Sequence, residues 1–442
     1  MFDLAQAAVR FPWTMTVFGA QEVLGSIVPS KEVGISADLY RVAATARREF
    51  NGIAPLFASY QFFDFAQRIA VDTAADILSL RALNPSYLMN LSSELSKTSA
   101  DAYQTIGTPE ALQYTVKRIK NTFTVVDLVN QVNAPHQMSP DGDYPLEKVI
   151  ADCYANDPYP ALWSVEGVGE RYTEAWMGAG RPIRDLFITG KGAKLEAKTL
   201  LMMHAGAGIA FAKLAILNLT PWSSDQEMDA ALRSFLRMCE ESSLPGYSGA
   251  ALESLGLVTR TWNGQLLLPL SRRLASLDPE AAEYYWHGAG RSMYFSPVNM
   301  LPGMSPWFSA DREPQDDISR KNARAGATWA FTVVNRRQPD IHANFLATRG
   351  YEVDGNDAFT NGVMSTMIMA GDMCPEDPYI EKLCTYEPTD PRAVAPWDKF
   401  IGPGFYDKVN YVRRTLQKHK RLGEVFRYQS LVNLADDLEQ QQ

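Results

Sequence analysis

The chain has 442 residues, 46% of them hydrophobic and 21% charged, a composition typical of folded globular proteins and not of disordered ones. Its formal net charge of −9 disfavours extended contact with phosphate backbones, so we expect no nucleic-acid partner. The four cysteines are widely separated and form no CxxC pair, which excludes a disulfide framework and favours reduced thiols in the cytoplasm.

Residues 1–133 are predicted to form a helical N-terminal domain. Apolar residues in Ala37–Leu80 recur at three- and four-residue steps, the spacing of one helix face, and Thr108-Pro109-Glu110 is typical of a helix start. The N-terminus lacks the basic segment and the cleavage site of a secretory signal. The apolar stretch Phe11–Pro29 is interrupted by polar residues, so it predicts a buried or interfacial helix, with peripheral membrane contact as the alternative.

Three further segments follow the N-terminal domain. Residues 134–160 are rich in proline and glycine and are predicted to connect two domains. Residues 161–372 form the predicted repeat domain, and residues 373–442 a C-terminal extension with a final helix or helix pair. The basic run from Lys408 to Arg427 in this extension is either an anion or membrane-surface contact or a solvated helix face.

Strand-forming patterns are sparse. Thr122–Val132 and Gly256–Leu267 are the two stretches in which short strands are possible. Asn263-Gly264 lies between apolar residues and is typical of a hairpin turn.

The central region contains six similar segments centred on glycine. Between consecutive aligned glycines the spacings are 39, 41, 41, 36 and 36 residues. A large apolar residue follows three positions after each of the first five glycines. The aligned glycines are Gly169, Gly208, Gly249, Gly290, Gly326 and Gly362.

A period of this length fits a two-helix unit that buries its apolar face against the next unit. We therefore predict a mainly α fold: a helical-repeat array, either an α-solenoid or a closed α/α toroid, after a helical N-terminal domain. Glycine serves such an array in one of two ways. It either lets two helices approach closely or allows a positive φ just before a helix starts.

Three of the glycine blocks carry a resemblance to a known family. MMHAGAGIAFAKL (202–214), WHGAGRSMYF (286–295) and NARAGATWAF (322–331) resemble the recurring glycine blocks of UnbL-type proteins. These bacterial proteins are encoded beside enediyne polyketide synthases and in other specialised-metabolite clusters. The resemblance covers about residues 160–335. It implies a role in specialised-metabolite biosynthesis and assigns no catalytic residue.

Two histidines occupy near-equivalent positions in the repeat. His204 lies four residues before its aligned glycine, and His287 lies three before. If neighbouring helices present both at one end of the array, their imidazoles can act as general bases, and these two are the predicted catalytic residues. The alternative is that each is a hydrogen-bonded structural histidine.

Charged residues within or beside the glycine blocks are the predicted substrate-binding groups. Arg171, Arg291 and Arg324 are candidates for holding a carboxylate or phosphate, on the expectation that each lies near a helix N-terminus. Glu166 is a potential partner for them, and Glu253 is a further carboxylate in the third block. The alternative is a set of ion pairs that fix the stacking of the repeats.

Aromatic residues are dense between residues 284 and 331. Tyr294 and Trp329 are predicted to line an apolar pocket for a polyketide-like chain, and core packing is the alternative. Gly206-Ala-Gly208 and Gly288-Ala-Gly290 lack the third glycine of a dinucleotide loop, and the five histidines show no zinc-ligand spacing. We therefore expect neither an organic cofactor nor a metal.

Three functions are compatible with these patterns. The first is a cofactor-independent enzyme that uses acid–base chemistry on a hydrophobic intermediate. The second is a non-catalytic scaffold that holds a pathway protein or a lipophilic product. The third is a protein that associates with a lipid surface. The substrate and the oligomeric state stay open.

Overall fold

The computed structural model describes residues 146–155, 157–296, 305–355 and 357–441, together with isolated positions between 114 and 128 and Asn299. The chain divides into two compact units. One comprises Met1–Lys120 with Pro297–Met304, and the other comprises Asn121–Ser296 with Ser305–Gln442. Nearly all described residues belong to the second unit, which is the subject below. The predicted helix at Phe11–Pro29 and the rest of the predicted N-terminal domain before Tyr114 lie outside the described residues.

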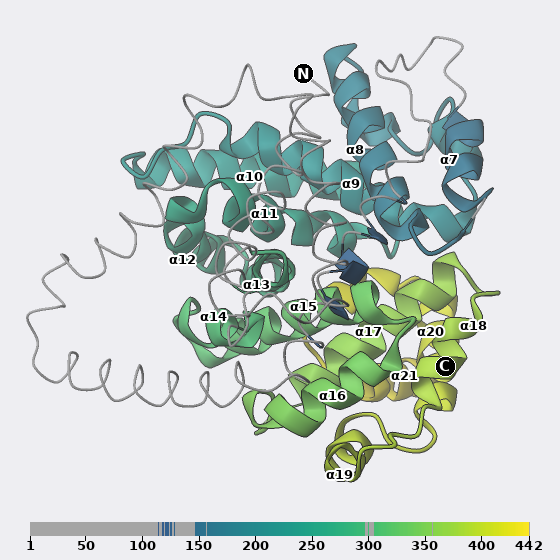
Figure 1. Cartoon of the computed structure of the whole chain (residues 1–442). Helices are drawn as coiled ribbons and strands as arrows, with labels where there is room; N and C mark the ends of the chain where they lie inside the picture. Colours follow the sequence, from purple (N-terminus) through teal and green to yellow (C-terminus); the bar gives the residue numbers. More distant parts are fainter. Residues whose placement is uncertain are drawn as a thin grey trace, which may run out of the picture. The chain divides into compact units, whose positions relative to one another are not determined.

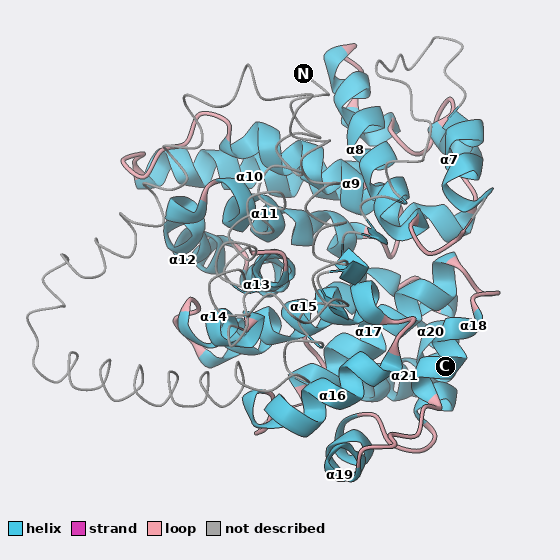
Figure 2. Cartoon of the chain, in the orientation of Figure 1, coloured by secondary structure: helices cyan, strands magenta, loops and turns pink. Residues whose placement is uncertain are grey.

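The second unit is helical, which confirms the predicted mainly α class for the described residues. Figure 2 shows helices joined by short loops. The central helices are α8 (Ala161–Gly178), α9 (Ala197–Ile216), α11 (Ser248–Trp262), α13 (Pro279–Tyr294), α15 (Asp317–Asn335) and α17 (Ala358–Met373). The others are α7 (Leu146–Ala155), α10 (Asp225–Ser242), α12 (Leu267–Leu277), α14 (Pro306–Arg312), α16 (Pro339–Arg349), α18 (Pro378–Cys384), α19 (Pro391–Phe400), α20 (Phe405–Lys418) and α21 (Leu431–Gln440).

In the two stretches considered for strands, the described residues are helical instead. The described residues between Thr122 and Leu128 are helical, and Gly256–Leu267 contains the end of α11, a 3₁₀ turn and the start of α12. Asn263 ends α11 by donating its backbone N–H to Thr259, so Asn263-Gly264 joins two helices. Helical packing prevails because Ala251, Leu255 and Val258 recur at helical spacing and are buried together.

The central helices pack in chain order. Each of α8, α9, α11, α13 and α15 contacts the next member of the series, which Figure 1 follows from the blue α8 to the green α17. Helices α10, α12, α14 and α16 lie between successive members of this series along the chain. Each of them contacts at least one of its two neighbours in the series. The last helix, α17, also contacts α8 and α9, so the end of the series returns to its beginning.

Glycine lets these helices approach one another at the backbone. A Cβ on Gly206 of α9 would lie 2.0 Å from the carbonyl oxygen of Glu166 on α8. A Cβ on Gly326 of α15 would lie 1.9 Å from the carbonyl oxygen of His287 on α13. None of the six aligned glycines has a positive φ. Of the two proposed reasons for these glycines, close helix approach applies to five of the six, and Gly249 instead lies against the backbone of Gly423.

The C-terminal residues pack against the central helices. The first part of the predicted C-terminal extension contains the short helices α18 and α19, each with proline at its first turn and an aspartate cap. A 3₁₀ segment, Leu422–Phe426, then contacts α11, α13, α17 and α20. The C-terminal chain thus reaches four helices, three of them in the central series.

Helix α9 is long and apolar enough to cross a membrane. In the folded chain, however, 78% of its apolar window is buried by protein. Its hydrophobicity is accounted for by contact with α8 and α11 on either side.

Candidate active site

Four charged or titratable side chains meet where the glycines bring the helices closest. Glu166 comes from α8 and Glu253 from α11. His287 and Arg291 lie one turn apart on α13, so they share a helix face. Three of these residues, Glu166, His287 and Arg291, were among those predicted from sequence to form the site. We call Glu166, Glu253, His287 and Arg291 the charge cluster.

Arg291 joins the two carboxylates. Its Nη1 donates to Oε2 of Glu253 at 2.7 Å, and its Nη2 donates to Oε1 and Oε2 of Glu166 at 3.0 and 3.2 Å. The guanidinium also lies over the ring of Trp329 on α15, 4.4 Å from its centroid. Arg291 is therefore held by ion pairs to α8 and α11 and by a cation–π contact to α15.

The second carboxylate oxygen of Glu253 orients His287. Nδ1 of His287 lies 3.0 Å from Oε1 of Glu253. A carboxylate accepts a hydrogen bond, so this contact places the imidazole proton on Nδ1 and leaves a lone pair on Nε2. Nε2 is buried and has no hydrogen-bond partner among the described residues. This is the arrangement of a general base oriented by a carboxylate.

Burial controls the charge of the cluster. His287 and Glu253 have no exposed surface, and Arg291 is 2% exposed. Burial lowers the pKa of His287, although the hydrogen bond to Glu253 opposes the change. Burial also raises the pKa of Glu166 against the attraction of Arg291. Two carboxylates and one guanidinium leave one negative charge, which a single proton on Glu166 or His287 neutralises.

Aromatic rings cover one side of the cluster. Phe426, from the C-terminal 3₁₀ segment, lies 6.2 Å from the ring of His287 and 6.0 Å from the ring of Trp329. Phe426 and Trp329 have no exposed surface. Nε1 of Trp329 is a buried donor without a partner in the described part of the chain. The site thus pairs a potential base with a potential hydrogen-bond donor in apolar surroundings.

His204, the other predicted catalytic residue, has a different environment. Its Nδ1 lies 2.7 Å from the carbonyl oxygen of Leu200, and its Nε2 accepts the backbone N–H of Leu244 at 3.0 Å. Its ring packs between Phe187 and Tyr247, and burial lowers its pKa to about 4. Both nitrogens are engaged, and no hydrogen bond or ring contact joins this residue to His287 within the described residues.

The predicted arginines do not lie at helix N-termini. Arg291 is in the last turn of α13, and Arg171 and Arg324 lie within α8 and α15. The expectation was wrong because the glycine blocks that carry these three arginines lie within helices, where backbone N–H groups are already bonded. Arg324 pairs with Asp311 of α14, away from the charge cluster. Arg171 is five residues beyond Glu166, roughly 140° further round α8.

Tyr294 also lies apart from the charge cluster. Its hydroxyl accepts a hydrogen bond from Asn335 at 3.0 Å, and its ring packs against Phe295 and Phe331. Trp329, by contrast, contacts the cluster directly through Arg291. The structure therefore brings together Glu166, His287, Arg291 and Trp329 from the predicted set, and adds Glu253 and Phe426.

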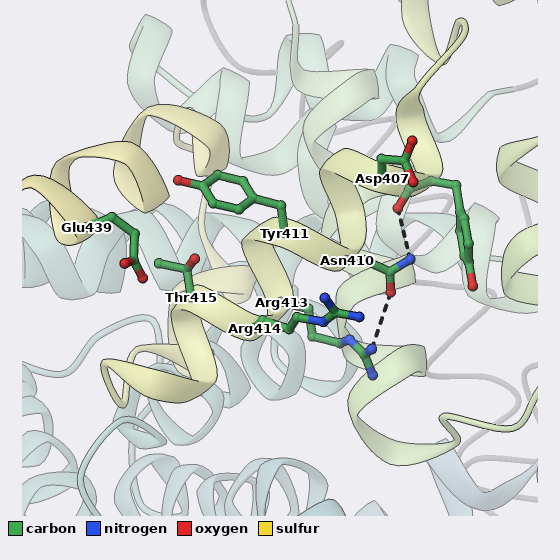
Figure 3. Close-up of a pocket in the computed structure, with 8 residues that line it drawn as sticks. Asp407, Asn410, Tyr411, Arg413, Arg414, Thr415 and Glu439 are labelled. Atoms are coloured by element: carbon green, nitrogen blue, oxygen red, sulfur yellow. Dashed lines mark hydrogen bonds between the residues drawn. The ribbon is translucent and has the colours of Figure 1, made fainter.

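Three side chains of the basic run near the C-terminus form ion pairs with carboxylates. Lys418 pairs with Glu439, Arg421 pairs with Glu424, and Arg427 pairs with three glutamates. An open hollow of about 820 Å³ lies on α20 and α21 (Figure 3). Its lining has two arginines and two carboxylates, so it has no excess charge to attract an anion. The lining residues are Tyr406, Asp407, Asn410, Tyr411, Arg413, Arg414, Thr415 and Glu439.

Comparisons with known proteins give no relative for this chain. No family model matches it, and no curated protein and no solved structure is significantly similar to it. Among the described residues no three metal-ligating side chains gather into a metal site. Function must therefore be inferred from the chemistry of the charge cluster.

Proposed function

We propose that this protein is a cofactor-independent enzyme of specialised-metabolite biosynthesis that transfers a proton on a hydrophobic, polyketide-like intermediate. The observation that carries the proposal is the buried pair of Glu253 and His287. The carboxylate holds Nδ1, and Nε2 has no partner in the described part of the chain. The biosynthetic context and a cytoplasmic location come from the sequence, through the resemblance of the glycine blocks and the reduced cysteines.

The roles of the residues follow from their contacts. Nε2 of His287 accepts a proton from a substrate carbon beside a carbonyl group. The imidazolium exchanges this proton with solvent and then donates a proton to another atom of the same molecule. Glu253 stabilises the imidazolium that forms in between. Arg291 donates to the other oxygen of Glu253 and so holds the carboxylate in place.

Trp329 and the rings around it complete the proposed site. Its Nε1 is a buried donor suited to a carbonyl oxygen that gains charge as the proton leaves. Trp329 offers apolar surface to a polyene or aromatic ring, and the ring of Phe426 marks the apolar space beside it. This environment favours a substrate with one polar group on an otherwise apolar skeleton.

We also propose that the six central helices belong to a helical-repeat array that closes into an α/α toroid. Glycine contacts at successive helix pairs support the repeat, because α8 meets α9 at Gly169 and Gly206, and α13 meets α15 at Gly290 and Gly326. The contacts of α17 with α8 and α9 support closure. In such a ring the charge cluster lies where inner helix faces converge.

One observation favours the scaffold as a second candidate. Leu214 and Leu217 at the end of α9 are 50% and 71% exposed, and Trp222 in the following loop is 86% exposed. Exposed apolar residues close together in the chain are typical of a protein-binding surface. Co-purification of a pathway protein that is lost on Trp222→Ser would favour this candidate. The lipid-surface alternative concerns Phe11–Pro29, outside the described residues, and liposome flotation of the intact protein tests it.

The enzyme proposal is tested with a producing strain that lacks the protein. The lipophilic intermediate that accumulates is isolated and incubated in D₂O with purified wild-type protein or with His287→Gln. We expect wild type to form product with deuterium at the carbon that changes, and His287→Gln to form none while keeping a similar thermal midpoint. His204→Gln is the matched control, and we expect it to keep activity. Full activity of folded His287→Gln would refute the proposal.

A further inference from the structure

The segment Arg421–Gln429, here called the C-terminal strap, crosses the ends of several central helices. The backbone N–H of Gly423 donates to the carbonyl of Gly246 just before α11, at 2.7 Å. Asn322 of α15 accepts the backbone N–H of Tyr428 at 2.7 Å. Asn361 of α17 donates to the carbonyl of Gln429 at 2.6 Å. The strap is therefore attached at its two ends, and its middle lies over α13.

The strap is held in shape mainly by its own residues. The carboxylate of Glu424 accepts hydrogen bonds from Arg421, Arg427 and Gln429, all within the strap. Burial raises the pKa of Glu424, but the attraction of Arg427 and these hydrogen bonds outweigh burial, and the pKa lies below its ordinary value. A segment with an internal ionic centre can move without breaking most of its own contacts.

The bonds between the strap and α13 are fewer and more exposed. Arg427 pairs with Glu280 and Glu283, whose side chains are 60% and 28% exposed. The hydroxyl of Tyr284 lies 3.4 Å from Glu424. Exposed ion pairs contribute little to stability and are weakened by salt. Solvent can replace the two ion pairs of Arg427 with α13, whereas the apolar side chains of the strap, Leu422, Val425 and Phe426, are buried.

Phe426 is the residue through which the strap covers the charge cluster. Its side chain is fully buried against the rings of His287 and Trp329. Each of those rings has a buried nitrogen without a partner in the described residues. Covering unpaired polar atoms with an apolar ring costs free energy, which is recovered when a polar group replaces that ring.

We infer that the C-terminal strap is a removable cover, and that Phe426 occupies the place of the substrate's apolar part until the cover opens. The inference rests on the proposed function for the identity of the substrate. The uncovered site would present a lone pair on His287 and a donor on Trp329. An apolar molecule with a carbonyl group would fill the space of Phe426 and accept a hydrogen bond from Trp329.

Accessibility of His287 tests the cover without any measurement of turnover. Diethyl pyrocarbonate modifies neutral imidazoles, and peptide mass spectrometry gives a separate rate for each histidine. In Glu424→Gln we expect modification of His287 to be at least about tenfold faster, because the strap loses its ionic centre. Arg427→Gln should have the same direction of effect. Glu439→Gln, a surface carboxylate paired with Lys418, is the matched control and should leave the rate unchanged.

His204 and His342 serve as internal references in the same experiment, because both are fully buried and neither contacts the strap. Selective acceleration at His287 supports the cover. Equal acceleration at all three histidines in both variants would mean that the whole unit opens together, and would overturn it. An unchanged His287 rate would overturn it as well, whatever the activity of the wild type.

Binding of small aromatic ligands tests whether Phe426 occupies the place of the substrate's apolar part. Phe426→Ala leaves a space of about one aromatic ring beside Trp329 and His287. We expect acetophenone, a ring with a carbonyl group, to raise the thermal midpoint of this variant more than ethylbenzene, which lacks the oxygen. Phe400→Ala removes a buried ring that packs on Phe359, and it should show no such preference. Equal effects of the two compounds on Phe426→Ala would refute the assignment of Phe426.

Discussion

Glu253 and His287 lie 3.0 Å apart, from carboxylate oxygen to imidazole nitrogen, at a place where neither side chain has exposed surface. Such a pair is costly to bury unless other groups compensate its charge. Arg291 compensates Glu253 and also Glu166, so four side chains from three helices depend on one another. A substitution in the charge cluster can therefore change both catalysis and the stability of the fold.

Glu253→Gln should slow catalysis by removing the negative charge beside His287. The amide has the same shape but no longer fixes the imidazole proton on Nδ1 or stabilises an imidazolium. We expect the rate of deuterium transfer to fall by about 10²–10⁴-fold. Glu313→Gln is a control of the same chemical change at a partly exposed pair with Arg260, and it should keep the wild-type rate. A folded Glu253→Gln protein with the wild-type rate would show that His287 needs no carboxylate.

Arg291→Met should act on stability. The variant leaves two buried carboxylates without their common partner, and we expect unfolding in urea to require about 3–5 kcal/mol less free energy at pH 7. Burial already raises the folded-state pKa of Glu166, and without the opposing attraction of Arg291 this pKa rises further. The stability of the variant relative to wild type should therefore recover as the pH falls toward 5. Arg324→Met, at a pair whose side chains are 13% and 37% exposed, should cost less than Arg291→Met.

Local sequence predicted the helical class, since this depends on spacing along one chain, but it left open whether the glycines serve close helix approach or a positive φ. It also selected Glu166, His287 and Arg291, because each lies within a few residues of an aligned glycine, where neighbouring helices touch. It did not separate His204 from His287. The two differ by one position relative to their glycines, which rotates the side chain by about 100° round the helix.

Other parts of the site depend on tertiary contacts alone. Glu253 had little weight in the sequence because a single carboxylate in a helix carries no distinctive pattern. Phe426 lies 135 residues after Arg291, and no periodicity connects a C-terminal 3₁₀ segment to the centre of α13. The hairpin predicted at Asn263-Gly264 was wrong because the same two residues are also typical of the junction between two helices. The burial of the apolar face of α11 favours the helical junction over the hairpin.

The buried histidines should make stability depend on pH. Burial lowers the pKa of His204 to about 4 and that of His342 to about 3, whereas an ordinary histidine titrates near 6.5. The unfolded chain therefore binds protons first as the pH falls below 6.5. The contribution of His204 and His342 to the free energy of unfolding is complete above pH 6.5. It is lost progressively as the pH falls toward their folded-state pKa values.

Between pH 6.5 and its folded-state pKa, each such histidine lowers the free energy of unfolding by up to about 1.4 kcal/mol for each unit that the pH falls. Urea unfolding at pH 7, 6 and 5 measures the slope, which should be flatter in His342→Leu than in wild type. The comparison is made above pH 5, where most carboxylates of the unfolded chain stay ionised. Identical slopes for the two proteins would contradict burial of a neutral His342.

Two glycines on α8 offer the sharpest test of helix approach. A Cβ on Gly169 would lie 2.6 Å from the carbonyl oxygen of Met203 on α9, whereas a Cβ on Gly167 meets nothing within 4 Å. Gly169→Ala must push α8 away from α9 or distort one of them, and we expect it to cost at least about 2 kcal/mol in urea unfolding. Gly167→Ala should instead stabilise the helix by about 0.5–1 kcal/mol, because alanine has the higher helix propensity. Since Glu166 lies on the same helix, displacement of α8 in Gly169→Ala should also loosen the pairing with Arg291. Equal effects of the two substitutions would show that the close backbone contact does not hold these helices together.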